Sequence, residues 1–187
     1  IPGARLHAIA SRSGERAAEF AQKHNIPVYY DTWEKLLTDP DVDIVYVATH
    51  HTFHFKNALS SLNAGKAVLC EKPVTMNKRE LEILVKTARE KSLFLMEAMW
   101  TRFLPSTLKV LEIIKSGEMG PLLDIYADFG DQTEYDPIHR IYDPSKGGGA
   151  LLDIGVYPLF LSLLLSGVPN NIKAIARFAE NSADISC

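Results

Sequence analysis

Residues 67–73, Ala-Val-Leu-Cys-Glu-Lys-Pro, constrain the fold of this chain more than any other stretch. Four small or apolar residues run directly into an acid, a base and a proline. Uninterrupted apolar strands are typical of parallel sheets covered on both faces, and such sheets bind ligands beyond the carboxyl ends of their strands. Because Pro73 favours an extended backbone at the preceding residue and ends the strand, we expect Lys72 at a ligand-binding edge. A surface lysine after an ordinary strand is the alternative.

Short apolar segments alternate with segments of helical periodicity through the first half of the chain. The expected strands are residues 6–10, 44–48, 67–70 and 93–96, with 27–30 as a brief strand or extended link, and the expected helices are residues 15–24, 31–37, 55–63 and 77–91. This alternation implies βαβ crossovers and a parallel sheet. We expect Ser13 and Asn77 to cap two of the helices.

The alternation stops after Glu97. Beyond it the sequence predicts a helix at 104–116, a half-exposed strand at 122–129, a polar turn-rich segment at 131–146, a helix from the glycine triplet 147–149 to about residue 165, and a last strand at 172–178. We therefore predict an α/β fold. A truncated, Rossmann-like parallel sheet in residues 1–99 forms a partial dinucleotide-binding domain, and residues 100–187 form an incomplete α+β domain, with the boundary near Met99.

Composition excludes several classes of protein. A net charge of −3 gives no reason to expect nucleic acid or an acidic membrane surface as a partner. Two cysteines are too few for a disulfide framework and suit a reducing compartment such as the cytoplasm. No stretch reaches the roughly 18 charge-free apolar residues of a membrane span. The chain begins without methionine and lacks the strand, Gly-x-Gly-x-x-Gly and helix that open a nucleotide domain, so we expect a fragment.

Residues 11–16 join the first expected strand to the first expected helix. In a nucleotide domain an acid at this place favours a free 2′-hydroxyl, whereas an arginine accommodates a 2′-phosphate. Arg12 offers a planar fork of donors, Arg16 lies one turn further on, and the helix N-terminus adds partial positive charge. The alternative is a solvated helix start.

Three histidines, His50, His51 and His54, follow the strand expected at 44–48. Their proximity suggests metal, but no Cys, Asp or Glu completes a zinc set at a familiar spacing. We therefore predict no metal, and a loop that contacts a ligand, with His54 as its most interesting member.

Asp153 and Tyr157 stand four residues apart and so share one face of a helix that is otherwise apolar. Burial of both polar tips requires partners. An unperturbed phenol has a pKa of about 10, which is too high for a base at neutral pH. A nearby ammonium such as that of Lys72 favours the phenolate. Such a pair relays a proton in alcohol oxidation or carbonyl reduction. A core tyrosine hydrogen-bonded to a capping aspartate is the alternative.

Residues 100–103, Trp-Thr-Arg-Phe, lie at the expected domain junction. Clefts between domains are preferred small-molecule sites. Trp100 is suited to line an apolar pocket there, and Arg102 to anchor an anion or a carboxylate. The alternative is a side-chain staple between domains.

Together these segments resemble the Gfo/Idh/MocA oxidoreductase family. The matching motifs are residues 64–73, Thr49 and His54 at a Thr-x-x-x-x-His spacing, and Gly-Gly-Gly-Ala-Leu-Leu-Asp-Ile-Gly at 147–155. Residues 70–73, 96–103 and 155–157 look most like one branch, the dimeric dihydrodiol dehydrogenases, and Ser11-Arg12 is similar to that branch's NADP-binding turn. The resemblance covers essentially the whole chain.

This resemblance implies an NADP-dependent oxidoreductase, a homodimer when complete, that oxidises trans-dihydrodiols of aromatic hydrocarbons or D-xylose. Carried over by position, Lys72 lies beside the nicotinamide and the reacting hydroxyl, Tyr157 is the acid/base, and Asp153 supports it. Trp100, Arg102 and Tyr157 contact the substrate. The cofactor-binding residues are Ser11, Arg12, Arg16, Thr49, His51, His54, Glu71 and Lys72.

Other readings stay open at this point. Lys72, rather than Tyr157, is the alternative proton carrier. A non-catalytic nucleotide-binding sensor or scaffold, an inactive truncated isoform, and a hydrolase or lyase that uses bound nicotinamide transiently are alternatives to a dehydrogenase, since fold does not fix function. Because the glycine-rich pyrophosphate loop is missing, we expect the isolated chain to bind NADP weakly or not at all.

Overall fold

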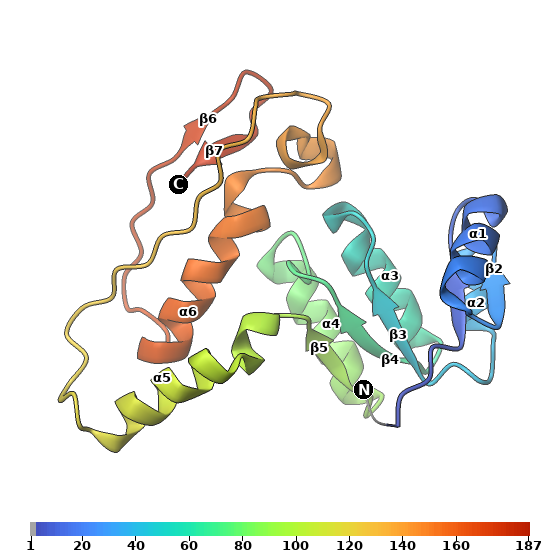
Figure 1. Ribbon diagram of the computed structural model, residues 1–187, viewed down its shortest axis with the longest axis horizontal. Helices are drawn as coiled ribbons and strands as arrows, with labels where there is room; N and C mark the ends of the chain where they lie inside the picture. Colours follow the sequence, from blue (N-terminus) through green and yellow to red (C-terminus); the bar gives the residue numbers. More distant parts are fainter. Residues whose placement is uncertain (1–2) are drawn as a thin grey trace. The chain divides into compact units, whose positions relative to one another are not determined.

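The computed structural model describes residues 3–187. The chain divides into two compact units. The first comprises the residues up to Thr49 together with Phe53–Glu71 and Asn77–Glu97, and the second comprises His50–Thr52, Lys72–Met76 and Ala98–Cys187. Figure 1 shows the elements of both in sequence colours. Each unit is described by itself below.

The first unit is built on parallel strands, as the alternation predicts. Strands β3 (Ile44–Val47), β4 (Ala67–Cys70) and β5 (Leu95–Glu97) form a three-stranded parallel sheet in the order β3-β4-β5, and β1 (Ala8–Ala10) pairs in parallel with β2 (Val28–Tyr30). The helices between them are α1 (Gly14–His24), α2 (Trp33–Leu37), α3 (His51–Asn63) and α4 (Lys78–Glu90). The Rossmann-like α/β fold expected from the sequence is therefore confirmed.

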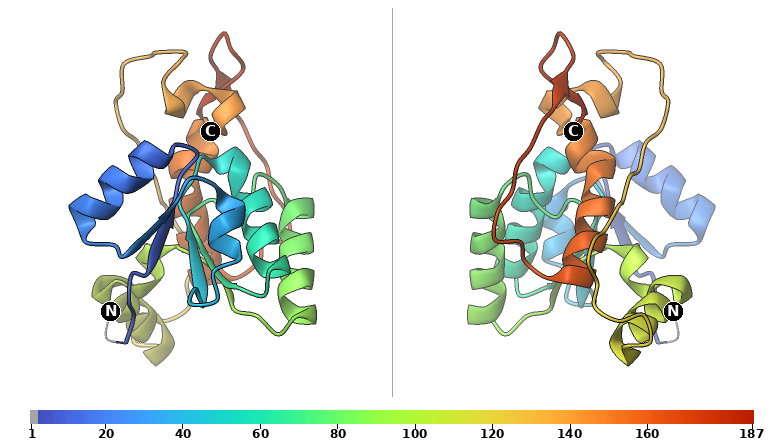
Figure 2. Two further views of the ribbon diagram at one scale, coloured as in Figure 1. Left: turned by 90° about the vertical axis from the view of Figure 1, so that its right-hand side faces the viewer. Right: turned by 90° about the vertical axis from the view of Figure 1, so that its left-hand side faces the viewer.

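The sheet β3-β4-β5 is covered on one face, which corrects the expectation of a sheet buried on both. In β3, Val45 and Val47 are buried, whereas Ile44 is 50% exposed and Tyr46 is 55% exposed. Right-handed crossovers between neighbouring parallel strands place successive helices on the same side of a sheet. Here α3 and α4 are those helices, and Figure 2 shows both on one side of the strands. Which side chains of the sheet are buried therefore depends on the face that the crossover helices cover, and not only on the apolar character of the strands.

The expected caps are confirmed. Ser13 accepts a hydrogen bond from the Arg16 amide at 3.3 Å and caps α1. Asn77 accepts one from the Glu80 amide at 3.0 Å and caps α4. Each side chain satisfies one of the amides that a helix start leaves without a partner.

Most of the regular elements of the second unit are helices, joined by long segments without helix or strand. Its elements are η1 (Trp100–Phe103), α5 (Pro105–Ser116), η2 (Arg140–Tyr142), η3 (Pro144–Lys146), the π-helix η4 (Leu151–Gly155), α6 (Val156–Ser166) and the antiparallel pair β6 (Arg177–Phe178) and β7 (Asp184–Ser186). The helix expected after the glycine triplet thus consists of a π-helical turn followed by an α-helix.

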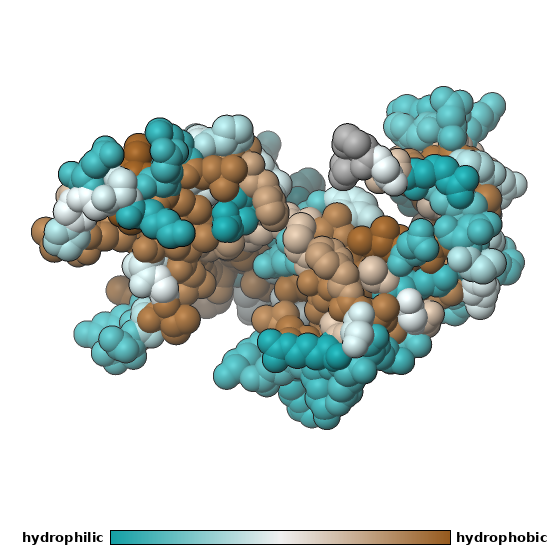
Figure 3. Space-filling view, turned by 90° about the horizontal axis from the view of Figure 1, so that it is seen from below, coloured by the Kyte–Doolittle hydropathy of each residue, from teal (hydrophilic) through white to brown (hydrophobic). Residues whose placement is uncertain are grey.

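Two predicted strands of the second unit are wrong. Residues 122–129 are not a strand, and only Arg177–Phe178 is a strand within the predicted 172–178. An alternation of apolar and polar residues indicates which side chains are suited to burial. A strand forms only where a second strand pairs with it. Large apolar side chains here are open to solvent, among them Leu123 at 90%, Tyr126 at 100% and Ile175 at 88% exposure. Figure 3 shows hydrophobic residues on the surface seen from below.

One helical segment of the described residues, Pro144–Ser166, is long and apolar enough to cross a membrane by length and composition. Core helices of soluble proteins also meet these criteria. The segment contains Asp153, whose carboxylate is ion-paired with Lys72 and Arg140, and ionised side chains are rare in membrane helices. That a membrane is not a partner stays a prediction.

Candidate active site

Lys72 lies two residues after Cys70, the last residue of β4, and belongs to the second unit. Its ammonium donates to the backbone carbonyl of Asp153, and Nζ lies 3.4 Å from Asp153 Oδ1. Nζ also lies 5.1 Å from the centroid of the Tyr157 ring. The Lys72 side chain is 14% exposed, so this charge is held in a partly dry environment. The three residues singled out from the sequence therefore meet in space.

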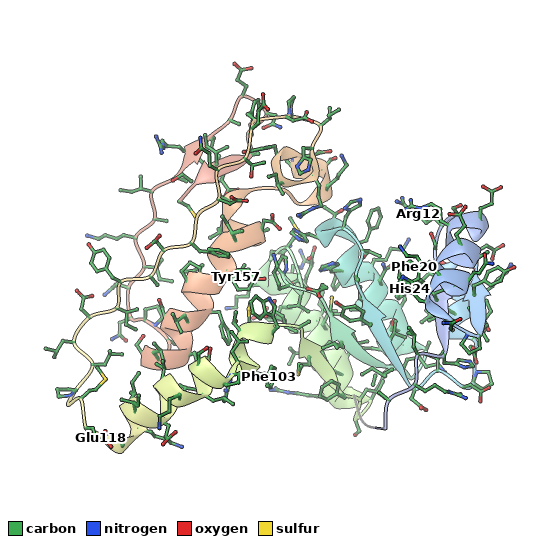
Figure 4. The ribbon with its side chains drawn as sticks, viewed as in Figure 1. Arg12, Phe20, His24, Phe103, Glu118 and Tyr157 are labelled. Atoms are coloured by element: carbon green, nitrogen blue, oxygen red, sulfur yellow. The ribbon has the colours of Figure 1, made fainter. Side chains whose placement is uncertain are left out.

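The helix that carries Asp153 and Tyr157 has an unusual start. Asp153 lies in the π-helical turn η4, and Tyr157 lies in the first turn of α6, where Figure 4 labels it. In a π-helical turn the carbonyl of one residue accepts from the amide five residues later. For Asp153 that residue is Pro158, which has no amide hydrogen. The Asp153 carbonyl accepts a hydrogen bond from the Lys72 ammonium.

Several basic side chains lie close to the Asp153 carboxylate. Arg140 donates from Nη1 to Oδ1 at 3.0 Å and from Nη2 to Oδ2 at 3.5 Å. His51 Nε2 lies 4.0 Å from Oδ1. Burial raises the pKa of Asp153, but the hydrogen bond from Arg140 and the charge of Lys72 outweigh it, and the net pKa is lowered. The carboxyl group is therefore ionised at neutral pH.

Tyr157 is fixed by aromatic neighbours. Its hydroxyl accepts a hydrogen bond from Trp100 Nε1 at 3.1 Å, and the two ring centroids are 6.0 Å apart in an edge arrangement. Phe129 also packs edge-on against the Tyr157 ring, with the two ring centroids 5.5 Å apart. The alternative of a core tyrosine hydrogen-bonded to Asp153 is not what the structure shows, because the hydroxyl's partner is Trp100.

A cavity of about 280 Å³ opens beside these rings within the second unit. Its wall includes Trp100, Leu104, Phe129, Tyr157 and Phe160. Its size is close to the lower end of the range for small-molecule sites, and such sites are apolar with a few polar groups. The Tyr157 hydroxyl is one polar group at this wall, and Asp128 is another lining residue. The arrangement suits a small ring that carries a hydroxyl.

The glycine triplet lets the loop before η4 pack closely. Gly147 has φ +77°, and a Cβ there would lie 2.6 Å from the Cβ of His51. A Cβ on Gly148 would lie 2.6 Å from the carbonyl oxygen of Arg140. His51 Nδ1 is 2.8 Å from the Gly147 carbonyl oxygen and hydrogen-bonds to it. His51, predicted to bind the cofactor, lies here against this loop and near Asp153.

Replacing Gly147 by alanine is expected to destabilise the chain by about 2–5 kcal/mol, because it adds a steric clash to the strain of a left-handed backbone. Gly117 is the matched control, since it has φ +78° and nothing within 4 Å of the added Cβ. Its replacement should cost only about 1–2 kcal/mol. Urea unfolding of both variants measures the difference, and equal losses would contradict the close packing at Gly147.

The remaining predicted residues lie in the first unit, apart from Arg102 in η1 of the second. The Arg12 guanidinium stacks 5.6 Å from the centroid of the Phe53 ring, and Ser11 Oγ accepts from the Ser13 amide at 3.3 Å. Arg12 and Arg16 are both exposed near the start of α1. This end of β1 therefore presents two guanidinium groups to solvent.

Thr49 and His54 lie together at the end of β3. His54 is fully buried, and its Nε2 is 2.9 Å from the Thr49 carbonyl oxygen. With no exposed surface, His54 fixes this loop in the structure, whereas the sequence led us to expect a side chain in contact with a ligand. Its role toward a cofactor stays a prediction.

Glu71 precedes Lys72 and is hydrogen-bonded by the Tyr46 hydroxyl. Burial and this carboxylate raise the pKa of Tyr46 to about 12. Tyr46 is therefore a donor at any ordinary pH, and it anchors the carboxylate at the end of β4.

A histidine and two acids of the first unit come close enough to one another to suggest a cation. One ligand atom each from His7, Asp39 and Asp41 lies within 4.8 Å of the others. However, Asp39 already accepts from the Tyr30 hydroxyl at 3.0 Å and from the Asp41 amide at 2.9 Å, and lies 3.0 Å from His7 Nε2. The group is therefore a hydrogen-bond network around a buried carboxylate. The prediction of no metal concerned His50, His51 and His54 and did not consider this group.

Arg140 and Phe129 are the site residues that sequence reasoning missed. Arg140 lies in a polar, turn-rich stretch without periodicity, and nothing in the sequence connects it to Asp153. Phe129 ends the segment mistaken for a strand, where its apolar character was read as a sheet position.

Comparison with known proteins identifies the family. Residues 1–99 match the family described as "Oxidoreductase family, NAD-binding Rossmann fold" (GFO_IDH_MocA), and residues 107–186 match the "GFO/IDH/MocA C-terminal domain". The trans-1,2-dihydrobenzene-1,2-diol dehydrogenase of Bos taurus is 42% identical over 179 residues, which is 95% of this chain and 53% of that protein. The enzyme of the same name from Danio rerio is 43% identical over the same shares. The chain thus spans about half the length of these relatives.

Solved structures agree with this assignment. A 3-ketoreductase, KijD10 from Actinomadura kijaniata in complex with NADP and TDP-benzene, superposes with a TM-score of 0.75 at 32% identity, covering 89% of this chain and 51% of that one. A levoglucosan dehydrogenase in complex with NADH and levoglucosan superposes with a TM-score of 0.75 at 26% identity, covering 87% and 45%. From the sequence matches, the shared fold and the motifs at residues 64–73 and 147–155, the chain belongs to the GFO/IDH/MocA family of oxidoreductases.

Proposed function

We propose that this chain carries the proton-handling half of the active site of an NADP-dependent dehydrogenase that oxidises a hydroxyl of a trans-dihydrodiol. The observation that carries the proposal is the meeting of Lys72, Asp153 and Tyr157 beside an aromatic cavity. The names of the curated relatives support an alcohol of this kind. A sugar such as D-xylose is the second candidate, and the sugar in the levoglucosan dehydrogenase structure favours it.

In the oxidation direction Tyr157 takes the proton of the substrate hydroxyl. The Lys72 ammonium lies 5.1 Å from the centroid of its ring, and Trp100 Nε1 donates to its hydroxyl. Asp153, ionised and paired with Lys72, holds that ammonium in place. NADP, when bound, supplies the acceptor for the hydride. In carbonyl reduction the same phenol returns the proton.

The residues at the end of β1 suit the 2′-phosphate of NADP. Arg12 and Arg16 are exposed, and both lie at the amino-terminal end of α1, where helix amides carry partial positive charge. Two guanidinium groups near a helix start suit a doubly charged phosphate better than a free hydroxyl. This observation favours NADP over NAD.

The aromatic wall favours a flat apolar substrate over a sugar. Trp100, Phe129 and Tyr157 meet edge to face, and such walls bind a hydrocarbon ring by burial of apolar surface. A pentose needs a hydrogen-bond partner for each hydroxyl that it buries. The polar side chains that line the cavity are those of Thr101, Thr107, Asp128 and Tyr157, and these are the residues that would have to bind a sugar's hydroxyls.

A chimera tests the proposed reaction. Because the chain spans about half of its relatives, the flanking segments of the Bos taurus relative are joined to it, and this protein is called the extended chimera. With a benzene dihydrodiol and NADP, nicotinamide absorbance should rise. Product formation without a change in that absorbance would favour the hydrolase or lyase alternative. Binding of NADP without turnover of dihydrodiols, pentoses or inositols would favour the sensor alternative.

Replacing Arg12 by alanine in the extended chimera is expected to raise the KM for NADP about 10-fold to 100-fold, the worth of a charge-assisted hydrogen bond. The KM for NAD, which lacks the 2′-phosphate, should change little. Arg5→Ala, at an exposed position before β1, serves as the control. Equal effects on both nucleotides would remove Arg12 from the proposed phosphate site.

A further inference from the structure

We propose that Arg140 is a positioning residue of the proposed active site, whose guanidinium orients the Asp153 carboxylate so that one oxygen faces Lys72. This inference rests on the proposed function for its role in turnover. The effect of Arg140 on the orientation and ionisation of the Asp153 carboxylate does not depend on any reaction.

The geometry of the pair is that of two parallel donors on one carboxylate. Nη1 reaches Oδ1 at 3.0 Å and Nη2 reaches Oδ2 at 3.5 Å. A planar guanidinium fixes the plane of a carboxylate in this arrangement, which an ammonium does not. Oδ1, the oxygen nearer Arg140, is also the one 3.4 Å from Lys72 Nζ. The orientation imposed by Arg140 is therefore the one that meets Lys72.

The loop that carries Arg140 is itself held on several sides. The Gly149 amide donates to the Ile141 carbonyl at 2.8 Å, and Asn181 Nδ2 donates to the Tyr142 carbonyl at 2.6 Å. Gly148 leaves no room for a side chain beside the Arg140 carbonyl. Arg140 thus extends from a fixed backbone in η2 onto the π-helical turn that carries Asp153.

Arg140 acts through Asp153 and not on the substrate. Its side chain is 46% exposed, and it is not among the residues that line the cavity beside Tyr157. Three groups face the Asp153 carboxylate: Lys72 from the loop after β4, Arg140 from η2 and His51 from the start of α3. With burial opposing ionisation of Asp153, Arg140 is the strongest influence that favours it. Without Arg140, Lys72 and His51 face a carboxylate that protonates more readily.

Carboxyl ¹³C NMR of the isolated chain tests this control of Asp153 directly. The wild type, Arg140→Lys and Arg140→Met are compared, with Asp153→Asn used to assign the signal. The Asp153 signal should titrate at higher pH in Arg140→Met than in the wild type, with Arg140→Lys between them. Arg177→Met, on the exposed strand β6, should leave the titration unchanged. If Arg140→Met leaves the Asp153 titration where it was, the inference is overturned.

Kinetics of the extended chimera test the positioning role. Arg140→Met should lower kcat about tenfold or more, because a small misplacement of catalytic groups has effects of that size. KM should change little, and the acid limb of the pH profile should move to higher pH. Arg140→Lys or added guanidinium should restore part of kcat. An unchanged kcat and acid limb would overturn the role. If the wild-type chimera shows no turnover, the proposed function fails, and the NMR titration alone decides the inference.

Discussion

Replacing Tyr157 by phenylalanine in the extended chimera is expected to lower kcat by about 10²–10⁴, the usual contribution of a general acid or base. The change removes one oxygen and leaves the ring, so the edge contacts with Trp100 and Phe129 remain. Only the hydroxyl that would take the substrate proton, and the hydrogen bond it accepts from Trp100 at 3.1 Å, are lost. Initial rates at saturating NADP across pH measure the effect.

The matched control for this variant is Tyr126→Phe. Tyr126 belongs to the same unit, is fully exposed, and loses the same oxygen. Its kcat should match that of the wild type. If Tyr157→Phe also retains wild-type turnover and an unchanged pH profile, Tyr157 is not the acid or base.

Replacing Lys72 by methionine is expected to lower kcat by a similar factor, about 10²–10⁴, at nearly constant side-chain volume. The ammonium that donates to the Asp153 carbonyl and lies 5.1 Å from the Tyr157 ring centroid is then missing. The residue that would take the substrate proton then has no ammonium beside its ring. Lys78→Met, at a side chain 87% exposed, is the control and should leave kcat unchanged.

The two substitutions also separate the proton carriers. If Tyr157 carries the proton, Tyr157→Phe abolishes the basic group seen in the pH profile, and Lys72→Met retains that group. If Lys72 carries it, Tyr157→Phe keeps the group and Lys72→Met abolishes it. The first outcome is the one that the geometry favours, because Lys72 already donates to Asp153.

Local pattern predicted the first unit well because its elements depend on neighbours in sequence. The parallel strands, the helices between them and the caps Ser13 and Asn77 all follow from periodicity and from short-range hydrogen bonds. The exposure of Ile44 and Tyr46 did not follow, since it depends on which face the crossovers cover. The prediction of strands at residues 122–129 and over most of 172–178 failed for a related reason, because a strand needs a pairing partner and alternation does not identify one.

The individual residues of the site could be predicted from the sequence, but the contacts between them could not. Asp153 and Tyr157 were visible as polar residues on one face of an apolar helix, and Lys72 as a base at the end of a strand. Asp153, whose carbonyl accepts from Lys72, lies in a π-helical turn, and periodicity does not reveal either feature. Arg140 donates to Asp153 from a turn-rich loop whose backbone packs closely against Gly148. No sequence pattern indicates this contact between distant segments.

A double-mutant cycle between Lys72→Met and Tyr157→Phe in the extended chimera tests most directly whether these residues act as one group. Residues of one catalytic unit lose activity non-additively. We therefore predict that the double variant's kcat/KM lies within a few-fold of the slower single variant. Losses that multiply, as for independent sites, would contradict a shared proton-handling group at Lys72 and Tyr157.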